Sequence, residues 1–145
     1  MHTTVPVRVE DSIYKDKYQA KVALESGDFY IFDRYVVGEV HEGQHITWEQ
    51  IKVLVDRVHE HFGSSDIEVD YISNRIHSYS VQPKDWLSFY KERHKLKSFS
   101  VVAYNKLGAM NIALERLFAK APFHRFSSLD AAISQVLGDH SNTAQ

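Results

Sequence analysis

The sequence predicts one α/β domain, with a mixed sheet that begins as an N-terminal antiparallel hairpin and continues as parallel strands covered by about four helices. Its 145 residues suffice for one hydrophobic core but not for two. Its composition, 43% hydrophobic and 25% charged, is that of a globular protein. Strand-like and helix-like patterns also alternate along most of the chain, as they do where helices connect parallel strands.

The ends of the chain differ from its middle. Residues 1–16 are polar and have no regular pattern, so we expect a flexible N-terminal arm. The domain is expected over residues 17–138, followed by a disordered tail over residues 139–145. Polar and hydrophobic residues alternate from Tyr18 to Leu24, which predicts a half-buried strand. A Ser-Gly-Asp turn and the apolar run Phe29–Phe32 then complete a hairpin.

A third strand and the clearest helix follow the hairpin. The extended run Tyr35–Val40 contains Gly38, which predicts a bulge or the close approach of another group to the backbone. Thr47 is a good N-cap, and Gln50 three residues later can complete a capping box. Hydrophobic residues then recur at spacings of three and four up to Phe62, which predicts a helix with one buried face.

The second half of the chain alternates between strand and helix patterns. Strands are expected over residues 67–72, 99–104 and, briefly, 122–126, and helices after Pro83, from Leu107 to Ala121, and after Ser127 or Ser128. A polar stretch from Ser73 to Gln82 is expected to be a loop. Strands that alternate with helices need crossover connections, so we expect 67–72 and 99–104 to be parallel neighbours.

The sequence lacks the features that several classes of protein function require. The net charge of −2, with scattered basic residues, gives no strong field to attract nucleic acid or an anionic membrane. There is no cysteine, and no segment approaches the roughly 20 apolar residues that span a bilayer. No export signal is visible, so we expect a cytoplasmic protein. Without a glycine-rich phosphate loop or a Gly-x-Ser-x-Gly elbow, we expect neither a cofactor nor enzymatic activity.

Nine histidines raise the question of a metal site. His59 and His61 lie two residues apart on the predicted helix, so they point in nearly opposite directions. His41 and His45 flank a turn and can approach each other, but no third ligand is placed by its spacing. We therefore expect surface histidines and no bound metal.

The order of elements over residues 17–138 resembles the STAS domain, the fold of bacterial anti-sigma-factor antagonists and of sulfate-transporter cytoplasmic domains. The stretches that carry the resemblance are "FYIFDRYVVGEV", "YISNRIHSYSVQP" and "FSSLDAAISQVL". Antagonists of this family carry a phosphorylatable serine in an Asp-x-Ser-Gly-type turn. Ser73 stands near the corresponding place, but neither the preceding pair nor the following glycine is present, so its role as a phosphosite is an open question.

Ligands of open sheets bind beyond the carboxyl ends of parallel strands, and two such ends are visible here. If the two strands are neighbours, Arg75, His77 and Lys106 converge on one small anionic or polar group. The residues expected at this rim are Ser73, Asn74, Arg75, His77, Tyr79, Asn105 and Lys106. The alternative is a connecting loop held by its own hydrogen bonds from side chains to the backbone.

The function expected first is a non-catalytic regulatory or protein-interaction module of STAS-like type. It would present a sheet edge and the polar loop to a protein partner, or to another copy in a homodimer. The alternative is a domain that binds a small molecule or a lipid fragment in a pocket between the sheet and its helices, and an enzyme comes third. A large apolar pocket would favour the ligand. A filled core with Tyr30, Phe32 and Tyr35 exposed at an edge would favour the partner.

Overall fold

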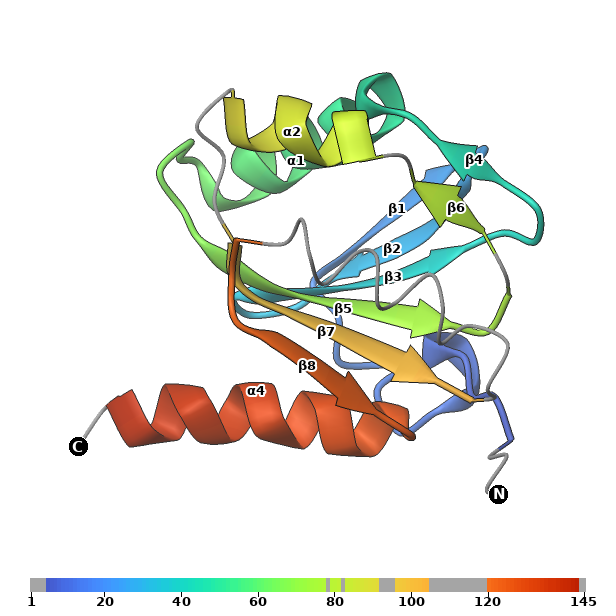
Figure 1. The fold of residues 1–145 in the computed structure, drawn as a ribbon. Helices are drawn as coiled ribbons and strands as arrows, with labels where there is room; N and C mark the ends of the chain where they lie inside the picture. The colour runs from blue at the N-terminus through green and yellow to red at the C-terminus, as the bar shows by residue number, and fades with distance from the viewer. Residues whose placement is uncertain (1–4, 78, 82, 92–95, 105–119, 144–145) are drawn as a thin grey trace.

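The computed structural model describes residues 5–77, 79–81, 83–91, 96–104 and 120–143. Its centre is a six-stranded sheet in the order β1-β2-β3-β5-β7-β8 (Figure 1). The first three strands are antiparallel, and β3, β5, β7 and β8 are parallel. The expected α/β class, with an antiparallel start followed by parallel strands, is therefore confirmed.

The elements have the following bounds. The strands of the sheet are β1 (Ala20–Leu24), β2 (Gly27–Ile31), β3 (Tyr35–Val40), β5 (Val69–Arg75), β7 (Leu96–Ala103) and β8 (Phe123–Phe126). The remaining elements are the 3-10 helix η1 (Val9–Asp11), the short strands β4 (His45–Ile46) and β6 (Ser80–Val81), and the helices α1 (Trp48–Phe62), α2 (Pro83–Lys91) and α4 (Leu129–Thr143). Three of the expected helices thus lie within the described residues, and the one expected from Leu107 to Ala121 lies mostly outside them.

Helices cover both faces of the sheet. α1 and α2 lie over one face and α4 lies under the other, where the N-terminal segment also packs (Figure 1). β5 shows how one strand serves both cores, since Ile72 faces α4 and Tyr71 faces α1. The buried aromatic residues Tyr30, Phe32 and Tyr35 belong to the α4 side, so they do not form an exposed edge.

The N-terminal segment is packed rather than loose over the part that is described. Val9 is fully buried and Tyr14 nearly so, both within the core on the α4 side. The Tyr14 hydroxyl donates a hydrogen bond of 2.8 Å to Asp130 of α4. Burial raises the pKa of Tyr14 to about 12, and the bond to Asp130 acts in the same direction. The sequence prediction of a flexible arm did not anticipate these contacts.

Local signals placed the boundaries of α1 correctly. Gln50 Oε1 accepts the Thr47 backbone N–H at 2.9 Å, which is half of the predicted capping box. Gly63 ends the helix in the left-handed conformation, with φ 70°. At the other end of the chain, α4 continues past Gly138 to Thr143, so residues 139–143 extend the helix in place of the expected tail.

A small parallel bridge joins the entrances of two helices. His45 pairs with Ser80 and Ile46 with Val81, just before α1 and α2 begin. Asp85 of α2 also accepts the Trp48 backbone N–H of α1 at 2.8 Å. The two helices are thus held together at their N-terminal ends. None of the helices in the described residues is long and apolar enough to cross a membrane.

Candidate functional site

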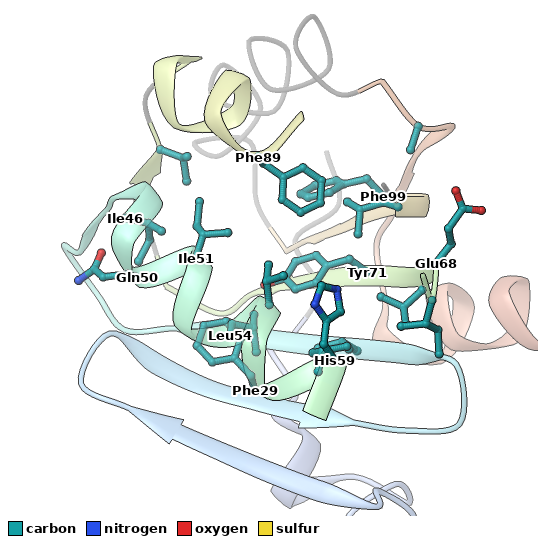
Figure 2. Close-up of a pocket in the computed structure, with 18 of the residues that line it drawn as sticks. Phe29, Ile46, Gln50, Ile51, Leu54, His59, Glu68, Tyr71, Phe89 and Phe99 are labelled. Carbon is teal, nitrogen blue, oxygen red and sulfur yellow. The ribbon is translucent and has the colours of Figure 1, made fainter. Parts of the chain in front are cut away.

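A cavity of about 830 Å³ lies between the sheet and the helices α1 and α2 (Figure 2). Its floor comes from β2, β3, β5 and β7, and its roof comes from α1 and α2. This volume falls in the upper part of the range of small-molecule sites. Most of the residues that line it are apolar. The aromatic ones among the described residues are Phe29, Tyr71, Tyr79, Phe89 and Phe99.

Gly38 explains how one of these rings fits on the floor. A Cβ atom at this position would collide with the hydroxyl and ring of Tyr71 on β5, two residues before Ser73, which is the residue that pairs with Gly38. Gly38, which was predicted to allow the close approach of another group to the backbone, is therefore needed for the approach of the Tyr71 side chain. Because Gly38 has no side chain, the Tyr71 phenol lies across the sheet and projects into the cavity (Figure 2).

A polar group closes the floor at the carboxyl end of β5. Ser73 Oγ lies 2.7 Å from the Tyr79 hydroxyl and accepts the Arg75 Nε–H at 3.0 Å. The Arg75 guanidinium also lies 4.7 Å from the centre of the Tyr79 ring, a cation–π contact. Three of the predicted rim residues therefore form one cluster, and Tyr79 is the member that lines the cavity.

Asn74 belongs to a different cluster, because alternate residues of a strand face opposite sides of the sheet. Its amide donates to Glu39 at 2.8 Å and to the Val7 carbonyl at 2.9 Å. The Tyr104 hydroxyl donates to the Asn74 carbonyl oxygen at 2.6 Å, and the Val9 N–H donates to Glu39 at 2.8 Å. This buried network ties the N-terminal segment to the α4 side.

Burial governs the protonation of this network. It raises the pKa of Glu39 above its ordinary value, although the hydrogen bonds from Val9 and Asn74 act against the shift. Burial likewise raises the pKa of Tyr104 to about 12. The network thus holds the N-terminal segment against the sheet, on the face opposite the cavity.

The other rim residues lie in different places. His77 is exposed, and its Nδ1 lies 3.5 Å from a Glu42 carboxylate oxygen. Asn105 and Lys106 lie outside the described residues. The expected loop is shorter than predicted, since β5 continues to Arg75, which pairs with Ala103 of β7. The two strands are parallel neighbours, as the rim hypothesis requires.

Ser73 is almost completely buried, with 1% of its surface exposed. Its hydroxyl is engaged by both Tyr79 and Arg75. A kinase would therefore reach this hydroxyl only after β5 and the following turn had opened.

Charged residues border the cavity at the opposite end, where β5 begins. Asp66, Glu68 and Lys120 are exposed there, and His59 of α1 is half-buried nearby. Full charges thus occur at one solvent-facing end, while the middle is apolar. In the described part of the chain, no three histidine, aspartate or glutamate side chains are grouped to hold a metal ion.

The alternative function expected from the sequence placed a pocket between the sheet and its helices, but assigned no residues to it. The residues that line it have the spacing of ordinary core residues, which is the same whether they fill a space or surround one. Comparisons with protein-family models, with curated proteins and with solved structures found no significant match.

Proposed function

We propose that this chain binds a small, largely apolar molecule in the cavity between its sheet and helices α1 and α2. The observation that supports this proposal is the cavity itself, which is about 830 Å³ in volume and is lined mainly by aliphatic and aromatic side chains. Each methylene-sized group that moves from water into such a space contributes about 0.8 kcal/mol. The few polar groups at its two ends would orient the molecule.

A matched pair of variants on α1 tests the proposal. Leu54 lines the cavity, whereas Val53 is 45% exposed on the same helix. Leu54→Trp would fill the cavity with an indole ring, and Val53→Trp would add the same ring outside it. With the uncharged fluorescent probe N-phenyl-1-naphthylamine, we expect Leu54→Trp to weaken binding at least about tenfold and Val53→Trp to change it less than about twofold. Equal affinities for both variants, or no probe binding by the wild type, would refute the proposal.

The sequence also predicts a STAS-like regulatory module that acts through a protein partner or a second copy in the cytoplasm. That role stays a prediction, and the burial of Tyr30, Phe32 and Tyr35 removes the aromatic edge that would have favoured it. Native mass spectrometry of the purified full chain addresses both roles, because it reports the oligomeric state and any retained small molecule.

A further inference from the structure

Three aromatic side chains form a continuous row across neighbouring strands on the cavity side of the sheet. Tyr71 of β5 pairs in register with Phe99 of β7, which pairs with Phe123 of β8. The ring centres of Tyr71 and Phe99 are 5.5 Å apart with planes inclined by 28°. Those of Phe99 and Phe123 are 5.4 Å apart and inclined by 14°. The parallel pairing of three strands thus keeps three rings at one level.

Two of these rings line the cavity, Tyr71 and Phe99. The Tyr71 phenol extends over Gly38, so its ring lies along the floor of the cavity. Aromatic rings attract another aromatic ring in offset-stacked or edge-to-face arrangements, and these contacts add to the burial of apolar area.

The roof has a different character. Ile51, Leu54 and Val55 of α1 are aliphatic, and Phe89 of α2 adds an aromatic ring, 6% exposed, to the lining (Figure 2). A flat aromatic molecule between these layers would contact the rings of Tyr71 and Phe99 on one side and aliphatic groups on the other. A flexible alkyl chain would gain the same burial of apolar area without the contacts between aromatic rings.

We infer that the molecule bound in this cavity is a flat, uncharged aromatic compound rather than an alkyl chain. The inference rests on the proposed function and specifies its ligand class. Among the described residues, the charged ones at the cavity's exposed end are Asp66, Glu68 and Lys120, and because their signs are mixed they favour no single ionic head group. Within this arrangement Phe99 contacts the ligand, and Phe123, which does not line the cavity, is a positioning residue that supports Phe99.

The test compares 2-naphthol with octan-1-ol, two hydroxyl compounds of closely similar hydrophobicity. We expect the full-length protein to bind 2-naphthol about three- to tenfold more tightly, as measured by displacement of N-phenyl-1-naphthylamine. Phe99→Leu should bring the two affinities to within about twofold by weakening 2-naphthol alone. Phe123→Leu should reduce the preference partially.

Phe126→Leu is the matched control, because Phe126 lies on β8 but packs on the α4 side. It should leave the preference for 2-naphthol unchanged. If Phe99→Leu does not fold, as judged by thermal unfolding, the preference for 2-naphthol over octan-1-ol is compared between the wild type and Phe123→Leu instead. Octan-1-ol binding as tightly as 2-naphthol would overturn the inference and leave the proposed function intact. Failure of the protein to bind either alcohol or the probe would overturn the proposed function itself.

Discussion

The side-chain amide of Asn74 donates a hydrogen bond of 2.8 Å to the Glu39 carboxylate, between two parallel neighbouring strands and beneath the N-terminal segment. Both side chains are buried, and the same carboxylate oxygen also accepts the Val9 N–H. The bond from Val9 links the sheet to the N-terminal segment, which lies 30 residues earlier in the sequence. Because Glu39 accepts both hydrogen bonds, their strength should depend on its charge.

The stability of the protein should vary with pH through Glu39. Burial raises its pKa in the folded state above the ordinary value of 4.5, so the folded state binds the proton more tightly than the unfolded state. The resulting stabilisation is complete below that ordinary value and is lost as the pH rises through the folded-state pKa. Over this window the wild type should lose free energy of unfolding relative to Glu39→Gln, measured by urea unfolding. A constant difference between the two proteins would contradict this account.

The burial of the N-terminal segment gives a matched pair of substitutions. Val9 is 0% exposed and Val5 is 80% exposed. Val9→Ala removes two buried methyl groups and should cost about 2 kcal/mol of unfolding free energy, whereas Val5→Ala should change it by less than about 0.5 kcal/mol. Chemical denaturation measures both. Similar small effects would mean that the segment is loose in solution.

Gly38→Ala should destabilise the protein by about 1–3 kcal/mol, because its new methyl group collides with Tyr71. Tyr71→Val makes room for that methyl group. In a double-mutant cycle, the cost of Gly38→Ala should therefore be much smaller in the Tyr71→Val background. Additive effects would show that the alanine is accommodated without any movement of Tyr71.

Tyr79 contributes through its hydroxyl and through its ring, and two substitutions separate these. Tyr79→Phe removes the hydroxyl that bonds to Ser73 and keeps the ring, and it should cost about 0.5–1.5 kcal/mol. Tyr79→Ala also removes the cation–π contact with Arg75 and should cost at least about 1 kcal/mol more. Thermal and urea unfolding of both variants provide the measurement. Equal losses would assign the entire effect to the hydroxyl.

Regular patterns predicted the sheet and α1 because their signals are local. Alternation along β1, the Thr47–Gln50 cap and the spacing up to Phe62 all concern residues near one another in the chain. Ser73, Asn74 and Arg75 were predicted to be in a loop because serine and asparagine are typical of turns. Their partners, the partly buried Tyr79 and the buried Glu39, lie outside the strand, so the strand pattern alone does not contain them.

The N-terminal segment was missed for a similar reason. Val9 and Tyr14 are single apolar residues in a polar stretch, with no period to reveal a buried side. The contact that fixes Val9 is with Glu39, 30 residues later. The site was predicted in part: Ser73, Arg75 and Tyr79 do come together, but the cavity beside them depends on how far the helices stand from the sheet. Residue spacing does not encode that distance.

The bridge between β4 and β6 makes the two ends of the roof unequal. Main-chain pairing and the Trp48–Asp85 hydrogen bond fasten α1 and α2 to each other beside Ile46 and Val81. At the far end the border consists of exposed or half-exposed residues, 65–68 and 120–122. Within the part of the chain that the structure describes, separating the two helices at that end would break fewer backbone hydrogen bonds than at the bridged end. A ligand should therefore enter and leave past Glu68, while α1 and α2 stay attached to each other at the bridged end.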